Sequence, residues 1–423
     1  MSHREGSLAA PVRHALGWDE APFWDEAALG DELARTFDIC HGCRRCVNLC
    51  GAFPQLFDLV DSGPTGELDG VPRARFAEVV DRCYLCDVCF LTKCPYVPPH
   101  EWNIDFPHLM LRAKAVAFRK DGGRWRDRVL ASTDRLGSFA GIPIVTEVVN
   151  RVNDSAAGRV AAEKVLGVDR RAWRPEYARH TFRSQAVDAP ALPVRDGERT
   201  PGKVAVYATC FVNYNEPGIG HDLLAVLAHN GITHRVVEKE ACCGMPRLEL
   251  GDLEGVRRQK EINIPVLARL AREGWAIVAA IPSCVLMYRQ ELPLLFPGDG
   301  LLSREFPRPL GKVAYHVPCH GRVQNIGRKT EEVLRWVPGT EVTTIERCSG
   351  HAGTWGVKKE FHDAAMKIGR PVFRAVVEAA PDWLASDCQL AGHHIAQGTE
   401  AMGATPPLAH PITLLRMAYG LGD

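Results

Sequence analysis

The chain has 423 residues, of which 46% are hydrophobic, and this is enough for two or three domains that each bury a core. Lysine plus arginine and aspartate plus glutamate both number 51, so the net charge is zero and no basic surface for nucleic acid is indicated. The N-terminus shows no secretion signal, and no apolar run reaches the roughly 18 residues of a membrane span. We therefore expect a cytoplasmic protein that binds no nucleic acid and has no transmembrane segment, with peripheral association at the inner face of the membrane left open.

The first 35 residues are expected to form a helical lead, because residues 25–37 have an amphipathic pattern. Residues 36–112 follow as a cysteine-rich segment, which holds two short runs of four cysteines among the 15 in the chain. An extracellular protein stabilised by disulfides is the alternative interpretation. Disulfides are rare in the cytoplasm and a secretion signal is missing, so the close spacing favours thiolates that bind metal.

The two cysteine runs have the spacing of iron–sulfur ligands. The first is C-x2-C-x2-C-x3-C and the second is C-x2-C-x2-C-x4-C-P. Three thiolates at C-x2-C-x2-C surround one face of a [4Fe–4S] cube, and the fourth cysteine of such a run ligates the other cube in two-cluster ferredoxins. The expected ligands are Cys40, Cys43, Cys46 and Cys94 for cluster 1, and Cys83, Cys86, Cys89 and Cys50 for cluster 2.

Two departures from that motif remove no ligand: Gly51 stands in place of a proline, and one additional residue precedes Cys94. A pair of zinc ribbons is the alternative. Zinc sites of that kind use two C-x2-C halves separated by a dozen or more residues, and they do not need a third cysteine at the same spacing. We therefore favour iron–sulfur clusters over zinc.

Residues 113–182 are expected to form a helical connector, and residues 183–202 a linker rich in proline, glycine and charge. Strand and helix patterns then alternate through residues 203–308. The helix expected at 253–274 contains Pro265, which should kink or split it. Near-continuous apolar strands that alternate with helices predict a parallel sheet covered on both faces.

The same pattern recurs in residues 309–423. KVAVYATC is repeated as KVAYHVPC, EACCG as ERCSG, and the cysteine at 284 as that at 388, with offsets of 109, 106 and 104 residues. The cysteines of both copies fall at or just beyond strand ends, which is the edge of an open parallel sheet where ligands bind. The fold class is therefore α+β and α/β: a helical, ferredoxin-like domain with two [4Fe–4S] clusters, followed by two duplicated α/β modules.

The first of these modules contains a candidate four-thiolate centre, formed by Cys210, Cys242, Cys243 and Cys284. Two adjacent cysteines on a loop can both reach one metal centre, and Gly244 allows the backbone to turn after them. Free cysteines are often small buried hydrophobic residues, but that interpretation does not account for their recurrence at strand ends.

The C-x31-C-C-G-x39-C spacing resembles the CCG domain found in the B subunit of heterodisulfide reductase. A two-cluster segment followed by two CCG modules is similar to iron–sulfur-binding oxidoreductases with two CCG domains, the group that includes the C subunit of anaerobic glycerol-3-phosphate dehydrogenase. The resemblance covers residues 36–400. It implies an iron–sulfur subunit that passes electrons from a flavoprotein dehydrogenase partner toward quinone or another acceptor. The heterodisulfide reductase branch also implies a third iron–sulfur cluster, of the noncubane [4Fe–4S] type, at the first CCG centre.

The second module departs from the family pattern, because Ser349 replaces one of the paired cysteines. The family module often ends C-x-x-C, whereas Met287 follows Cys284 and Ala391 follows Cys388 at that spacing. The residues left for a second site are Cys319, Cys348 and Cys388, with His351 as a further ligand and His320, His393 and His394 nearby. A cluster, a zinc or haem site, and a site without metal all stay open.

Three functions are compatible with these patterns. The first is an electron-transfer subunit of an oxidoreductase complex, the second a heterodisulfide-reductase-like subunit that reduces a disulfide or thiol substrate at the CCG cluster, and the third a zinc-binding scaffold without redox activity. No dinucleotide-binding glycine fingerprint follows a strand, so hydride chemistry requires a partner subunit. We predict the first function.

Overall fold

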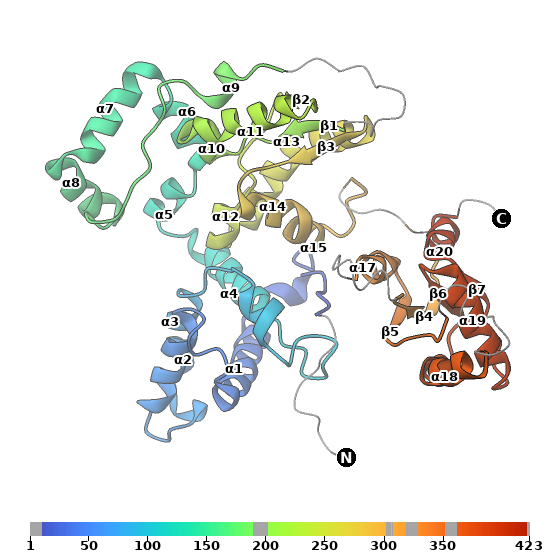
Figure 1. Ribbon diagram of the computed structural model, residues 1–423. Coiled ribbons are helices and arrows are strands. Elements are labelled where there is room, and N and C mark those ends of the chain that lie inside the picture. The colour runs from blue at the N-terminus through green and yellow to red at the C-terminus, as the bar shows by residue number, and fades with distance from the viewer. Residues whose placement is uncertain are drawn as a thin grey trace. The chain divides into compact units, whose positions relative to one another are not determined.

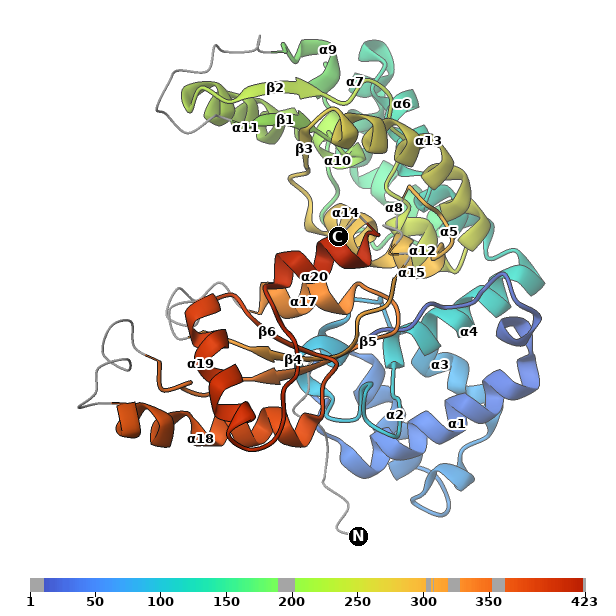
Figure 2. The ribbon, with the colours of Figure 1, turned by 90° about the vertical axis from the view of Figure 1, so that its right-hand side faces the viewer.

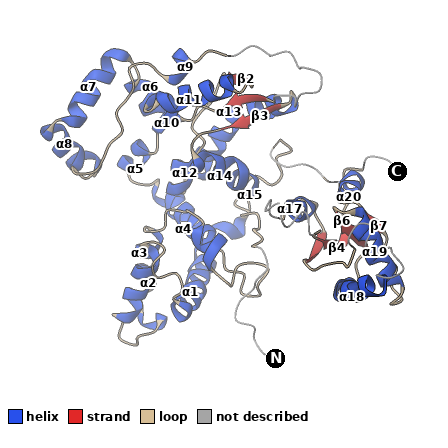
Figure 3. Cartoon of the chain, viewed as in Figure 1, coloured by secondary structure: helices blue, strands red, loops and turns tan. Residues whose placement is uncertain are grey.

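The computed structural model describes residues 11–188, 202–301, 306, 308–318, 328–351 and 362–420. The chain divides into two compact units, residues 1–303 and 304–423. Strands occur in two small parallel sheets, one in each unit, and helices form most of the remaining regular structure (Figures 1 and 3). Within the described residues, no helix combines the length and the apolar character needed to cross a membrane.

The first unit begins with a helical part that carries both cysteine runs. Its longest N-terminal helix is capped by the Asp25 carboxylate, which accepts hydrogen bonds from two backbone N–H groups of the first turn. This helix continues past the predicted lead and reaches Cys43, where Arg44 in a left-handed conformation ends it. The elements are η1 (Ala21–Trp24), α1 (Glu26–Cys43), α2 (Ala52–Asp61), η2 (Leu68–Gly70), η3 (Arg73–Arg75), α3 (Phe76–Val80), η4 (Cys89–Lys93) and α4 (Phe106–Asp121).

A series of short helices connects this part to the first sheet, as the amphipathic patterns predict. They are α5 (Trp125–Leu130), α6 (Thr133–Ala140), α7 (Pro143–Asp154), α8 (Ala156–Leu166) and α9 (Phe182–Gln185). The predicted linker at 183–202 lies mostly outside the described residues, and the structure resumes at Gly202.

The first sheet has the parallel strand order β2-β1-β3. Successive side chains of β1 point to opposite faces: Val204 and Val206 pack with α11, and Ala205 packs with α13. The elements are β1 (Lys203–Val206), α10 (Cys210–Tyr214), α11 (Pro217–His229), β2 (Thr233–Val236), α12 (Met245–Leu250), α13 (Leu253–Arg272), β3 (Trp275–Val278), α14 (Pro282–Leu286), η5 (Met287–Glu291) and α15 (Leu292–Leu295). A parallel sheet covered on both faces is thus present.

Helix α13 continues through Pro265, so the proline does not split it. Pro265 lies on the exposed side of the helix, whereas Ile264 and Leu267 are buried. Water can therefore hydrate the carbonyl group that the missing N–H leaves without a partner.

The second unit repeats the strand arrangement with one additional strand, in the order β5-β4-β6-β7. Helices α17 and α20 cover one face of this sheet, and α18 and α19 cover the other (Figure 2). The elements are β4 (Gly311–His316), α17 (Lys329–Arg335), β5 (Thr340–Ile345), α18 (His362–Ala379), β6 (Trp383–Ser386), α19 (Gln389–Glu400), β7 (Leu408–Ala409) and α20 (Pro411–Ala418). The order β5-β4-β6 corresponds to β2-β1-β3, as expected for a duplicated module.

A close backbone contact joins the cysteine-rich helices to the first sheet within the first unit. Helix α12 packs against α4. Gly251, which ends α12 at φ +81°, lies so near α4 that a Cβ atom there would be 2.4 Å from the carbonyl carbon of Lys114. Glycine is therefore required where the two helices meet.

Candidate metal centres

The structure brings the sulfurs of the two cysteine runs together in two groups. One cavity is lined by the first group, set A: Cys40, Cys43, Cys46 and Cys94. Cys40 and Cys43 lie one turn apart at the end of α1 and so share a face. Arg44, at φ +48°, ends the helix and turns the chain, which returns Cys46 to the cavity. Set A therefore combines three thiols of the first run with the last thiol of the second run.

A second cavity is lined by the other group, set B: Cys50, Cys83, Cys86 and Cys89. Within its loop, Leu85 and Asp87 adopt positive φ angles of +55° and +62°, a conformation that costs on the order of 1–3 kcal/mol for a residue with a side chain. Positive φ angles at every second residue of a loop can direct successive backbone N–H groups to one side, where they favour an anion. The strained loop therefore suits thiolates that surround an anionic cluster.

The two cavities are neighbours, because the buried ring of Phe53 lines both of them. The sulfur of Cys89 in set B is also close enough to feel the negative potential of Cys46 and Cys40 in set A. Two redox groups held by these sets would lie side by side, as electron transfer between them requires.

The donor chemistry fits iron–sulfur clusters. Burial raises the pKa of Cys40, and the negative potential of the other set A sulfurs raises that pKa further. Four thiolates packed this closely therefore need the positive charge of bound iron to remain ionised. Among the described side chains, no three His, Cys, Asp or Glu groups are arranged to hold a single metal ion. Four thiols that line one cavity are the ligand set that a [4Fe–4S] cluster uses.

The third thiol group, set C, lies at the ends of the strands of the first sheet: Cys210, Cys242, Cys243 and Cys284. Cys210 begins α10, Cys242 and Cys243 follow β2, and Cys284 lies in α14. Hydrogen bonds connect these sulfurs in the order Cys210, Cys242, Cys243, Cys284. Cys242, Cys243 and Cys284 are buried, whereas Cys210 is half-buried.

Cys242 is the sulfur of set C that ionises most readily. Hydrogen bonds from Cys210 and then from Cys243 lower its pKa well below the usual range of a thiol, and burial opposes this effect. The Oγ1 atom of Thr133 also donates to this sulfur, at 3.4 Å. Metals bind thiolates rather than thiols, so a lowered pKa is compatible with Cys242 as a candidate ligand.

Side chains outside the motif hold the Cys242–Cys243 loop in place. The buried Asn263 amide on α13 accepts from the Ala241 N–H at 2.7 Å and donates to the Cys242 carbonyl at 3.1 Å. The Tyr207 hydroxyl donates to the Ala241 carbonyl at 2.5 Å. Gly244, at φ +102°, allows the turn into α12. These contacts orient candidate ligands, a role that often changes metal affinity by roughly 10–100-fold when it is lost.

Comparisons with known proteins bear on the identity of these centres. The cysteine-rich (CCG) domain family matches residues 204–289 and again residues 313–395. The C subunit of anaerobic glycerol-3-phosphate dehydrogenase from Escherichia coli (strain K12) is 31% identical over 318 residues, which cover 69% of this chain and 77% of that protein. The chain belongs to the family of this dehydrogenase component.

Other relatives carry related names. The B subunit of fumarate reductase (CoM/CoB) from Methanothermobacter marburgensis is 26% identical over 240 residues, 53% of this chain and 48% of that protein. Lactate utilization protein A of Anoxybacillus flavithermus is 26% identical over 183 residues, 37% of this chain and 75% of that protein. The predicted family, iron–sulfur oxidoreductase subunits with two CCG domains, is thereby confirmed. A further relative, an iron–sulfur protein of Methanocaldococcus jannaschii that is 27% identical over 204 residues, supports iron–sulfur clusters as cofactors. The number of clusters and their ligands stay predictions.

The second CCG module keeps the loop geometry of the first. Gly350, at φ +84°, takes the place of Gly244. The carbonyl of Arg347 lies 3.0 Å from His316 Nε2, much as the corresponding carbonyl of the first module contacts a tyrosine hydroxyl. Ser349 is buried where the first module has Cys243. The third thiol of the four-sulfur series, the counterpart of Cys243, is therefore missing.

The structure also distinguishes the histidines near this loop. Cys348 is exposed, Cys388 is half-buried, and Cys319 and His320 lie outside the described residues. His394 is buried and its ring centre lies 5.9 Å from that of His351, whereas His393 is exposed. Within the described part of the chain, Nε2 of His351 and Nε2 of His394 make no hydrogen bond. His394 thus joins His351 as a candidate ligand, and His393 does not.

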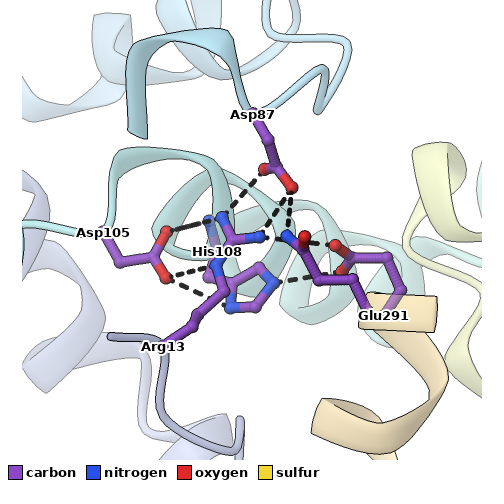
Figure 4. Close-up of polar contacts among 6 residues, drawn as sticks. Arg13, Asp87, Asp105, His108 and Glu291 are labelled. Atoms are coloured by element: carbon purple, nitrogen blue, oxygen red, sulfur yellow. Dashed lines mark hydrogen bonds and ion pairs between the residues drawn. The ribbon is translucent and has the colours of Figure 1, made fainter. Parts of the chain in front are cut away.

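A buried polar network connects the set B loop to the first CCG module (Figure 4). The Arg13 guanidinium donates two hydrogen bonds to Asp87, at 2.6 and 2.8 Å, and two to Asp105, at 2.8 and 3.0 Å. His108 Nε2 lies 3.1 Å from Glu291 Oε2, and Glu291 Oε1 lies 3.4 Å from Arg13. Asp87 belongs to the set B loop, and Glu291 ends the η5 turn that follows the Cys284 helix. The network therefore fixes the set B loop relative to set C.

Removing the cation of this network should destabilise the protein strongly. Arg13→Met leaves Asp87 buried without the guanidinium that donates to both of its oxygens, and such losses cost about 3–5 kcal/mol. We expect this decrease in the free energy of unfolding of the anaerobic protein, measured by urea denaturation. Arg73→Met is the matched control, because the Arg73–Asp31 pair is exposed and should contribute less than about 1 kcal/mol. Equal losses in the two variants would contradict a special role for the network.

Sequence patterns did not indicate the residues that support these centres. Thr133 lies in the connector, far from the CCG motif in sequence, and Arg13 lies in an irregular N-terminal segment. Asn263 looks like an ordinary polar residue of a helix. A polar residue on the buried face of the amphipathic pattern of α13 was the one available signal.

Proposed function

We propose that the chain is an iron–sulfur electron-transfer subunit, which relays electrons from a flavoprotein dehydrogenase subunit toward a quinone or another acceptor. The observation that carries this proposal is the grouping of twelve cysteines into sets A, B and C within one folded unit. The names of the relatives, which are subunits of a dehydrogenase and of a reductase, support the expectation of partner subunits.

We assign one [4Fe–4S] cluster to set A and one to set B, in a ferredoxin-type domain. A third iron–sulfur cluster, with the noncubane [4Fe–4S] type as its candidate form, belongs to set C. When bound, each of these clusters carries one electron at a time. The residues of the chain bury them, hold their ligands and donate hydrogen bonds to the sulfurs, as Thr133 does at Cys242. Such contacts adjust reduction potentials.

Reduction of a disulfide at set C is the second candidate function. It is favoured by one observation: Cys210 is half-buried while the other three thiols are buried, so a substrate sulfur could approach at that side. The replacement of the third thiol by Ser349 in the second module disfavours the full heterodisulfide reaction, because that reaction uses two complete CCG centres.

The electron-transfer function is tested by titrating the anaerobic full-length protein with photoreduced flavin mononucleotide and then reoxidising it. We expect reversible bleaching of the iron–sulfur absorbance and the return of at least about two electrons per chain to ferricenium. Irreversible bleaching, or the return of no electrons, would overturn the proposal. Rapid reoxidation by an organic disulfide, with none by a quinone, would favour the second candidate function instead.

A further inference from the structure

A large cavity lies between the connector helices and the first CCG module. It has a volume of about 560 Å³ and is lined mainly by apolar side chains of α5 to α8, by residues 173–177 and by α10. Small-molecule sites typically occupy about 300–1,000 Å³ and combine apolar walls with a few polar groups. The cavity therefore has the size and character of a ligand site.

Two of the residues that line this cavity connect it to set C. Cys210 belongs to set C and is hydrogen-bonded to Cys242. Thr133 lines the cavity as well, and its hydroxyl donates to the Cys242 sulfur. A molecule in the cavity would thus lie against Cys210, the half-buried sulfur of set C.

The lining also indicates what kind of molecule fits. Trp173, Tyr177 and Phe211 provide aromatic surfaces that suit a flat ring. Arg174 alone among the lining residues carries a formal charge, and within the described part of the chain it forms no ion pair. Its Nη2 atom donates to the Val168 carbonyl at 3.3 Å, whereas its buried Nε atom has no hydrogen-bond partner among the described residues. A buried donor of this kind is stabilised by an oxygen that accepts its hydrogen bond.

We propose that this cavity binds the electron acceptor, and that the acceptor is a quinone. The inference rests on the proposed function, because set C must deliver the electrons. One quinone takes up two electrons and two protons and becomes a hydroquinone; the electrons come from the reduced flavin of the partner and the protons from water. The quinone oxygens gain negative charge as electrons arrive, so Arg174 stabilises the reduced ligand more than the oxidised one.

A second cavity of the first unit serves as the control. It has a volume of about 360 Å³, lies along the edge strand β3, and has no cysteine among its lining residues. Ala162 on α8 lines the acceptor cavity, and Ala268 on α13 lines this control cavity. Both alanines are half-buried on helices, so Ala162→Trp and Ala268→Trp each fill one cavity at similar cost.

The experiment uses the full-length anaerobic protein and 2,3-dimethyl-1,4-naphthoquinone, whose substituted ring cannot add a thiol. Binding is measured by calorimetry with the oxidised protein, and electron transfer by stopped-flow reoxidation of the reduced protein. We expect Ala162→Trp and Arg174→Met each to weaken binding and to slow reoxidation by the quinone at least about tenfold, while reoxidation by ferricyanide changes less than about twofold. Ala268→Trp should leave all three values unchanged.

The outcomes separate this inference from the proposed function. Normal quinone binding and reduction in both Ala162→Trp and Arg174→Met would overturn the inference and leave the electron-transfer function intact. If Ala268→Trp weakened quinone binding and Ala162→Trp did not, the acceptor site would lie at the β3 edge. This result would also overturn the inference. Quinone binding that Ala162→Trp abolishes, in a protein that passes electrons to ferricyanide but to no quinone, would overturn the quinone as the acceptor and leave the electron-transfer function intact.

Discussion

Replacing Cys40 and Cys94 together with serine is expected to remove one [4Fe–4S] cluster, not two. Both sulfurs line the set A cavity, although they belong to different cysteine runs. The double variant Cys40→Ser/Cys94→Ser should therefore lose about four irons per chain, the same number as either single variant. Iron analysis and the electron paramagnetic resonance spectrum of the reduced protein measure this result.

The matched double variant combines Cys94→Ser with Cys83→Ser. Cys83 and Cys94 lie in the same run, yet they line different cavities, so this variant should lose about eight irons. If each run instead held its own cluster, the two results would be exchanged. A loss of about eight irons in Cys40→Ser/Cys94→Ser would therefore contradict the crossed assignment.

Cys243→Ser should stop electron transfer from the clusters of sets A and B to the CCG centre. The variant reproduces the Cys-Ser-Gly sequence of the second module and removes the sulfur between Cys242 and Cys284. We expect the loss of the third cluster and a decrease of at least about 100-fold in the rate of electron delivery to quinone, which exceeds the usual effect of a residue that only orients a ligand. The clusters of sets A and B should still be reduced, because neither set includes this residue.

Two further variants make this result specific. Ser349→Ala changes the corresponding buried position of the second module and should leave electron delivery unchanged within about twofold. Cys243→Ala tests whether a serine oxygen can replace the sulfur as a ligand. Normal quinone reduction in both Cys243 variants would show that electrons bypass set C.

Much of this architecture could be predicted from the sequence, because its signals are local or repeated. The spacing of each cysteine run predicted which thiols are grouped. The recurrence of the KVA and Cys-x-Gly patterns predicted the duplicated module. The parallel pairing of the strands could also be predicted, since apolar strands that alternate with helices pair in parallel. The exact ends of α1 could not, because the αL residue that ends it is an arginine, which gives no termination signal.

The supporting residues could not be predicted, because their partners are distant in sequence. Arg13 meets Glu291 only after the cysteine-rich helices and the first sheet have packed together. The acceptor cavity likewise exists only where the connector meets α10, and no single segment carries its pattern. His394 is selected over His393 by the face of α19 that is buried, which one residue of helix rotation decides.

Iron, acid-labile sulfide and zinc per chain, measured together on anaerobically purified full-length protein, test the central claim most directly. The account predicts about twelve irons, about twelve sulfides and almost no zinc, from two clusters in sets A and B and one in set C. About eight irons would leave set C without a cluster and remove the connection to the acceptor. Zinc with almost no iron would contradict the electron-transfer function itself.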